Sequence, residues 1–321
     1  MNKTLTTPNT LQEAVIFFAN YDNCHDFMMN LRWPDGKVIC PRCGSDNVAY
    51  LPNAHVFKCY EKHACQKFSL KVGTIFEDSP LGLDKWLPVM WMLTNCKNGV
   101  SSWEIHRAVG VTQKTAWFML QRARLAMQDN ETGGKLGGEV EVDETFIGGK
   151  ARNMHKDKRA AKITGTGGKD KTPVLGILER GGKVRTAVVR DRRKKTLDTI
   201  VRKHVETGSS VYTDILPSYN DLKIGYRHEM VNHAIEYVRD NVHTNGLENF
   251  WSLLKRSIGG TYVSVEPFHL FRYVDEQVFR FNNREDMGDS ERFVTVMRQI
   301  VGRRLTYKQL TGKTEEAAAI S

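Results

Sequence analysis

The stretch EVEVDETFIGG, residues 139–149, decides the fold class of the second half of the chain. Val140 and Val142 alternate with Glu141 and Asp143, which predicts a β-strand with one apolar face and one acidic face. An acidic face within a sheet is costly unless a cationic group compensates it. We therefore expect a basic side chain or a bound cation beside this strand.

The residues that follow this strand alternate between strand and helix patterns. Strands are predicted in TPVLGILERGG, KVRTAVVRD, SVYTDI and GYRHEMVNH, and helices in KTLDTIVRKHVETG, HTNGLENFWSLLKR, PFHLFRYVDEQVFRFNNR and SERFVTVMRQIVGRRL. This order predicts a mixed α/β sheet covered by helices. NETGGKLGG, residues 130–138, precedes the sheet and is rich in glycine and polar residues, which predicts a linker.

Residues 83–127 have helical periodicity and contain a helix-turn-helix outline. Ser101 or Ser102 can cap a first helix, Gly110 makes the turn, and Thr112 caps a second helix. If the second helix enters a major groove, its exposed polar side chains supply DNA contacts. These side chains are Gln113, Lys114, Gln121, Arg122 and Arg124. The alternative is a plain helical hairpin, and both interpretations place Trp103 and Trp117 in its core.

Four cysteines are grouped near the N-terminus. Cys40, Cys43, Cys59 and Cys65 have the spacing C-x2-C, fifteen residues, C-x5-C, which favours tetrahedral Zn²⁺ over disulfides. The second loop is wider than usual and contains His63, which is an alternative to Cys65 as the fourth ligand. A unit of about 35 residues buries too little surface to fold alone, so metal should stabilise it. Four ordinary buried thiols are the competing interpretation.

The charge balance favours an anionic partner. Lys and Arg outnumber Asp and Glu by 47 to 37, which gives a formal net charge of +10. Nucleic acid is the first candidate partner and an acidic membrane surface is the second. Because no long apolar run and no signal-peptide pattern is found, we expect a soluble, cytoplasmic protein. The basic stretch at residues 150–171 is either a solvated loop or a cationic insertion that follows a phosphate backbone.

Three carboxylates stand where they can converge. Asp143 lies on the strand quoted above, Asp214 ends the strand SVYTD, and Glu248 begins the helix HTNGLENFWSLLKR. Carboxylate ligation suits Mg²⁺ or Mn²⁺, and a pair of such ions can activate a nucleophile in phosphodiester chemistry. Lys255, two turns after Glu248 on the same helix face, can then hold the phosphate of the scissile strand.

Each acid also has an ordinary interpretation. Asp143 can be a solvent-facing strand residue, and Asp214 can be a turn acid before Pro217. Glu248 can be the last residue of a capping box that Asn245 begins. The residues alone leave these alternatives open.

The order of the motifs resembles a known family. CPRCG, GTIFEDSPLGLDKW, TAWFMLQRARLAM, VEVDETFIGG, VYTD and NHAIEYVRDNVHTNGLENFWSLLKRSIGGTY are similar to the zinc-ribbon insertion-sequence transposases, relatives of the eukaryotic Merlin elements. The resemblance covers residues 11–285. It implies an RNase H-like DDE catalytic domain that uses Mg²⁺ or Mn²⁺ to cut transposon ends and join them to target DNA. By position, its acidic triad is Asp143, Asp214 and Glu248, with Lys255 as the basic residue. His243 and Asn245 also match family positions, where they position a ligand or shape the turn.

These observations predict the domain order and the function. We expect an N-terminal helical segment at 1–35, a zinc ribbon at 36–72, a helix-turn-helix region at 80–129, a linker at 130–138, an RNase H-like domain at 139–285, and a C-terminal helix and tail at 286–321. The expected function is that of a nucleoid-associated DNA transposase, a homodimer on double-stranded DNA. The candidate DNA contacts are Lys58, Lys62, Lys114, Arg122, Arg124, Lys255 and Arg256. The alternatives are a catalytically silent DNA-binding protein derived from such an enzyme and a metal-dependent nuclease that cuts without joining.

Overall fold

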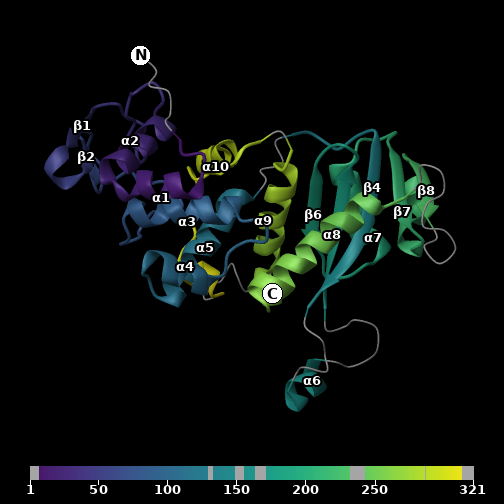
Figure 1. The fold of residues 1–321 in the computed structure, drawn as a ribbon. Helices are drawn as coiled ribbons and strands as arrows, with labels where there is room; N and C mark the ends of the chain where they lie inside the picture. Colours follow the sequence, from purple (N-terminus) through teal and green to yellow (C-terminus); the bar gives the residue numbers. More distant parts are fainter. Residues whose placement is uncertain are drawn as a thin grey trace. The chain divides into compact units, whose positions relative to one another are not determined.

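The computed structural model describes residues 7–128, 133–148, 155–162, 171–231, 243–285 and 287–312 (Figure 1). These residues form two units. The first contains described residues up to 127 together with those from 287 onward, and the second contains the described residues between 128 and 285. The C-terminal segment therefore packs with the N-terminal half of the chain.

Four helices form the core of the first unit. They are α1 (Leu11–Ala19), α2 (Tyr21–Arg32), α3 (Leu83–Asn95) and α10 (Asp289–Arg298). The side chains of Thr10 and Asn20 accept backbone N–H bonds at the starts of α1 and α2, which fixes where these helices begin. Phe18, Phe27 and Phe293 pack with ring centroids 5.5 to 5.7 Å apart. This aromatic cluster joins segments from opposite ends of the sequence.

The cysteine-bearing segment forms an antiparallel sheet in the order β1–β2–β3. Its elements are β1 (Val48–Leu51), the 3-10 turn η1 (Pro52–Ala54), β2 (Val56–Cys59) and β3 (Lys67–Phe68). Phe57 and Phe68 are buried and stack with their centroids 5.4 Å apart. This small core needs a further source of stability.

The predicted helix pair is present in the first unit. Its helices are α4 (Ser102–Val109) and α5 (Gln113–Met127), and a short helix α11 (Tyr307–Leu310) follows later in the chain. Ser101 and Glu104 form a capping box at the start of α4. Gly110 ends α4 with φ +64°, a conformation that glycine adopts without steric cost. Thr112 accepts the backbone N–H of Thr115 and starts α5.

Helix α5 is more deeply buried than its sequence predicts. The expectation that Gln121, Arg122 and Arg124 are exposed was wrong, because they are 0%, 4% and 1% exposed. Arg122 donates from Nε and Nη1 to two backbone carbonyl oxygens, at 3.1 and 2.8 Å, so its guanidinium ties segments of the unit together. Trp103, expected in the core, is 57% exposed, and Trp117 is half-buried. Helix α5 packs against α3, α4 and α10 within the first unit.

The second unit is built on a five-stranded sheet in the order β6–β5–β4–β7–β8. The strands are β4 (Glu139–Ile147), β5 (Thr172–Glu179), β6 (Val184–Val188), β7 (Ser210–Asp214) and β8 (Arg227–Val231). Strands β4, β5 and β6 pair antiparallel, whereas β7 and β8 run parallel to β4. The prediction of a mixed α/β sheet is confirmed.

Helices cover both faces of this sheet. The remaining elements are α6 (Lys156–Lys162), α7 (Lys194–His204), η3 (Pro217–Lys223), α8 (Asn245–Ser257), the π-helical turn η4 (Ile258–Tyr262), η5 (Pro267–His269) and α9 (Leu270–Asn282). Helices α7 and η3 share one hydrophobic core with the sheet, and α8 and α9 share the other. Figure 1 shows α8 lying across the strands. Val140 and Val142 point into the α7 core, so Glu141 and Asp143 face α8.

The end of the predicted linker is part of this second unit. Leu136 is 3% exposed and lies in the α7 core. Its N–H donates to the carbonyl of His204, and its carbonyl accepts the N–H of Glu206, both at 2.8 Å. The glycines around Leu136 predict flexibility, but its backbone bonds hold this segment beside α7.

Candidate active site and metal centre

Asp143 and Asp214 lie side by side at the centre of the sheet. Val142 of β4 is the register partner of Thr213 on the parallel strand β7, so each aspartate is one residue beyond that pair. Neighbouring strands are about 4.8 Å apart, and residues at the same level point to the same face. The structure thus brings together two acids that are 71 residues apart in the chain.

Electrostatics links these two acids to Glu248. Burial raises the pKa of Asp143 to about 6, although the indole N–H of Trp251 and the backbone N–H of Glu144 act in the opposite direction. The charges of Asp214 and Glu248 contribute to this increase. Both carboxylates are therefore close enough to repel a negative charge on Asp143, and a cation bound beside Asp143 would offset this repulsion.

The acidic patch formed by Asp143, Asp214 and Glu248 is open. Asp143 and Asp214 are half-buried, and Glu248 is exposed on the first turn of α8. Among the described residues, these carboxylates do not form a group whose oxygens all lie within 4.8 Å of one another. Lys255 is exposed seven residues after Glu248, which places both side chains on one face of α8.

Glu141 attaches the start of α8 to the sheet. Its carboxylate is 1% exposed and accepts the backbone N–H of Leu247 at 3.0 Å. Arg180 Nε donates to the same carboxylate at 3.0 Å, and His243 Nδ1 lies 3.4 Å from it. Arg180 and His243 are the basic partners that the acidic strand face requires. His243 thus shapes the entry to α8, although a second role in ligand positioning stays a prediction.

The capping-box interpretation of Glu248 is wrong. Helix α8 has Thr244 as its N-cap, and no side-chain cap bond is formed there. The donor at Leu247 is instead satisfied by Glu141, which comes from β4. Glu248 is consequently one residue too far into the helix to close a box with Asn245.

Two glycines allow α8 to lie close to the sheet. A Cβ atom on Gly246 would lie 2.4 Å from Leu178 Cδ2 and 2.9 Å from Glu141 Oε2. A Cβ atom on Gly176 of β5 would lie 2.6 Å from Trp251 Cζ2. Neither site has room for a larger residue, so the position of α8 over Asp143 depends on both glycines.

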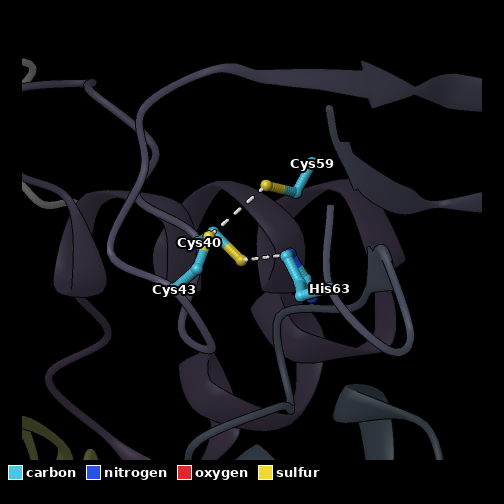
Figure 2. A group of neighbouring side chains, drawn as sticks. All are labelled: Cys40, Cys43, Cys59 and His63. Atoms are coloured by element: carbon cyan, nitrogen blue, oxygen red, sulfur yellow. Dashed lines mark hydrogen bonds between the residues drawn. The ribbon is translucent and has the colours of Figure 1, made fainter. Parts of the chain in front are cut away.

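A second group of polar side chains lies in the ribbon. Cys40, Cys43, Cys59 and His63 each offer one donor atom, and these atoms all lie within 4.8 Å of one another (Figure 2). Sγ of Cys40 is 3.6 Å from Nε2 of His63, and Sγ of Cys43 is 3.6 Å from Sγ of Cys59. Three cysteines and one histidine are a donor set that suits tetrahedral Zn²⁺.

Of the two candidates for the fourth member, the structure brings His63 into the group and not Cys65. Cys65 is exposed and has φ +57°. Nδ1 of His63 donates to the carbonyl of Ala64 at 2.9 Å, which leaves Nε2 as the acceptor beside Cys40. The x5 spacing hid this outcome, because the wide loop folds so that His63 within it, and not Cys65 at its end, faces the other cysteines.

One thiol of this group ionises more easily than an ordinary cysteine. Burial opposes a charge on Cys40, but hydrogen bonds from the backbone N–H groups of Arg42 and Cys43, together with those of the Cys43 and Cys59 thiols, outweigh it and bring the pKa of Cys40 down to about 7. Thiolates are the metal-binding form of cysteine. The local backbone therefore prepares Cys40 to act as a ligand.

Comparison with known proteins gives a family match for each of the two regions that contain these sites. Residues 135–282 match the ISXO2-like transposase domain, and residues 20–67 match the transposase zinc-ribbon domain. An uncharacterized transposase-like protein of Haemophilus influenzae is 32% identical over 120 residues, which cover 37% of this chain and 94% of the relative. The chain belongs to the zinc-ribbon, ISXO2-like transposase family. An uncharacterized protein in transposable element ISH50 of Halobacterium salinarum is also similar, with 27% identity over 250 residues, which cover 74% of this chain and 83% of that relative.

The predicted DNA contacts of this transposase-family chain differ in accessibility. Lys62, Lys114, Lys255 and Arg256 are exposed, and Lys58 is half-buried with its Nζ 5.0 Å from the ring centre of Tyr60. Arg122 and Arg124 are buried within the first unit, so they do not present a surface to DNA. The basic stretch at 150–171 lies largely outside the described residues. Within the described part of the chain, no helix has the length and apolar character needed to cross a membrane.

Sequence reasoning missed three polar residues of the transposase domain. Arg180 was not singled out, although the acidic face of β4 called for a cation. Trp251 was assigned only to the apolar stripe of α8, yet its Nε1 donates to Asp143 Oδ2 at 2.9 Å. Tyr219 donates its hydroxyl to Glu144 Oε1 at 2.5 Å on the opposite face of the sheet. No spacing rule connects these residues, because each pair is more than 35 positions apart in the chain.

Proposed function

We propose that the chain is a DNA transposase that binds the ends of an insertion sequence and uses divalent metal ions to cut a strand and join it to target DNA. The observation that carries this proposal is the acidic patch, in which Asp143 and Asp214 share one sheet face and Glu248 lies close enough to raise the pKa of Asp143. The antiparallel β6–β5–β4 meander followed by two parallel strands supports an RNase H-like domain, as the family implies.

The acidic patch suits Mg²⁺ or Mn²⁺. Its donors are carboxylate oxygens, which hard divalent cations prefer, and the charges of Asp214 and Glu248 disfavour ionisation of Asp143. Bound there, such ions supply activation of the attacking oxygen and stabilisation of the leaving oxygen in phosphodiester chemistry. Asp143, Asp214 and Glu248 are the residues that would hold them.

The exposed basic residues of α8 complement this chemistry. Lys255 lies two turns from Glu248 on the same face, and Arg256 is its exposed neighbour. Both are long cations suited to a DNA phosphate. We assign to Lys255 the holding of the scissile strand against the acidic patch.

The first unit supports the recognition part of this proposal. Zn²⁺ held by Cys40, Cys43, Cys59 and His63 would stabilise a short three-stranded ribbon with a small aromatic core around Phe57. Helices α4 and α5 form the pair expected of a helix-turn-helix, and Lys114 is exposed near the start of α5. Joining two DNA ends requires at least two recognition units, so we propose a homodimer on DNA.

A strand-transfer assay tests the function. The substrate is a duplex that carries the inverted repeat flanking the gene, already cut to expose its 3′ hydroxyl, and the target is a plasmid in Mg²⁺ buffer. We expect the full chain to join the end to the plasmid and Asp214→Asn to bind the end without joining it. Asp221→Asn is the matched control, because Asp221 pairs with Lys194 away from the acidic patch.

Two outcomes of this assay would overturn the proposal. If the protein cuts DNA but leaves the pre-cut end unjoined, it is a nuclease of the same fold. If it binds the end and performs neither step in Mg²⁺ or Mn²⁺, it is a DNA-binding protein without catalysis.

A further inference from the structure

Trp251 contacts the acidic patch directly. Its indole Nε1 donates to Oδ2 of Asp143 at 2.9 Å, and its side chain is 4% exposed. Trp251 comes three residues after Glu248 on α8, so one helical turn carries both a patch carboxylate and the hydrogen-bond donor to another. The indole therefore joins helix α8 to strand β4 at the centre of the patch.

The space for this indole is made by a glycine in the neighbouring strand. Gly176 of β5 is the register partner of Asp143. A Cβ atom there would lie 2.6 and 2.9 Å from Cζ2 and Cη2 of Trp251 and 2.8 Å from Cδ2 of Leu247. Because real Cβ atoms do not approach so closely, any larger residue at position 176 would displace the indole.

Packing alone does not explain this arrangement. The rings of Phe250 and Trp251 are both buried in the α8 core, and a phenylalanine at 251 would fill most of the same volume. What the indole adds is a single fixed donor, which lowers the pKa of Asp143 against the effect of its burial. A bond from a buried donor to one oxygen also fixes the rotation of the carboxylate.

We infer that Trp251 is a positioning residue, which orients the Asp143 carboxylate for a divalent cation and is itself seated by Gly176. This inference rests on the proposed function of the acidic patch. Trp251 does not touch substrate in this role. It acts through Asp143, in the way that outer hydrogen-bond partners orient the ligands of other metal sites.

The test is a titration of the full-length protein with Mn²⁺, in which electron paramagnetic resonance measures the bound Mn²⁺. Trp251→Phe removes the N–H and keeps a ring, and we expect its Mn²⁺ dissociation constant at the patch to rise about tenfold. Gly176→Ala is expected to weaken Mn²⁺ binding similarly, because the new methyl group displaces the indole. The matched controls are Trp103→Phe, at an exposed tryptophan of α4, and Gly260→Ala, where a Cβ would meet nothing within 4 Å. Both controls should bind Mn²⁺ like the wild type.

The outcomes separate this inference from the proposed function. If the wild type binds Mn²⁺, Asp143→Asn abolishes that binding and Trp251→Phe binds within twofold of the wild type, Trp251 is only a packing residue and the inference fails alone. If the wild type shows no Mn²⁺ binding that depends on Asp143, the proposed function fails as well. A lower melting temperature of Trp251→Phe with unchanged Mn²⁺ affinity also counts against the inference.

The Mn²⁺ dependence of cleavage provides a second test of the positioning role. We expect Trp251→Phe to require a higher Mn²⁺ concentration for half-maximal cleavage and to recover most of its turnover at saturating Mn²⁺. A residue needed only for folding would lose turnover at every Mn²⁺ concentration, and that result would contradict the positioning role.

Discussion

Replacing Asp143 with asparagine is expected to stabilise the second unit in the absence of divalent metal. The carboxylate is half-buried, and its pKa is raised from 3.8 to about 6 by that burial and by the charges of Asp214 and Glu248. A difference of about two pK units corresponds to about 3 kcal/mol between the folded and unfolded states. Asparagine keeps an oxygen for the indole N–H of Trp251 and removes the buried charge. We therefore expect a gain of about 2 to 3 kcal/mol at pH 7.5.

The sign of the pH dependence follows from the raised pKa. The folded state holds the proton of Asp143 more tightly than the unfolded state, so the favourable contribution is present below pH 3.8 and is lost as the pH rises through about 6. The advantage of Asp143→Asn should therefore be complete above pH 7 and nearly absent at pH 4. Adding Mg²⁺ at pH 7.5 should stabilise the wild type and not the variant.

The assay can be confined to the second unit. Trp251 is the only tryptophan in the sequence between residues 128 and 285, so its indole N–H signal in a ¹⁵N-labelled sample reports on this unit within the full chain. Urea titrations in Mg²⁺-free buffer at pH 4, 6 and 7.5 would follow the loss of that signal. Asp191→Asn is the control, because bonds from Arg193 and Thr196 lower the pKa of Asp191, and its replacement should not stabilise the unit.

A result of the opposite sign would refute the reasoning. If Asp143→Asn is less stable than the wild type at pH 7.5, the charge of Asp143 is compensated in the metal-free protein. If the gain is the same at pH 4 and pH 7.5, it does not come from the ionisation of Asp143.

Three further predictions concern the other parts of the molecule. Glu248→Gln should abolish cleavage and leave the melting temperature nearly unchanged, because Glu248 is exposed and closes no capping box; residual cleavage would remove it from the metal-binding set. His63→Ala should lower the zinc content, measured by metal analysis, and loosen the ribbon, measured by circular dichroism, whereas Cys65→Ser should retain one zinc per chain. The reverse result would restore Cys65 as the ligand. Lys62→Ala should weaken binding to DNA ends and reduce the slope of log binding constant against log salt concentration by about one. Equal slopes for the wild type and Lys62→Ala would exclude a phosphate contact at Lys62. Arg124→Ala should instead lower the melting temperature, because Arg124 is 1% exposed.

The sequence by itself determined the local elements and the order of the motifs. Alternation of apolar and acidic residues predicted β4, and the capping and turn residues Ser101, Gly110 and Thr112 predicted the α4–α5 turn. The cysteine spacing predicted the ribbon in the same way. These features depend on neighbours only a few residues apart, so periodicity and turn chemistry are enough to predict them.

Tertiary structure alone decided which side chains meet. The pairing of β4 with β7 places Asp143 beside Asp214, and the packing of α8 on Gly176 brings Trp251 onto Asp143. The same kind of contact buries Arg124 and turns His63, not Cys65, toward the other ribbon ligands. Such contacts join residues tens of positions apart, and strand register and helix packing set them. The physical reason is that the free energy of burying a polar side chain depends on the partner that the fold brings to it, so the same residue can be stable on the surface or in the interior.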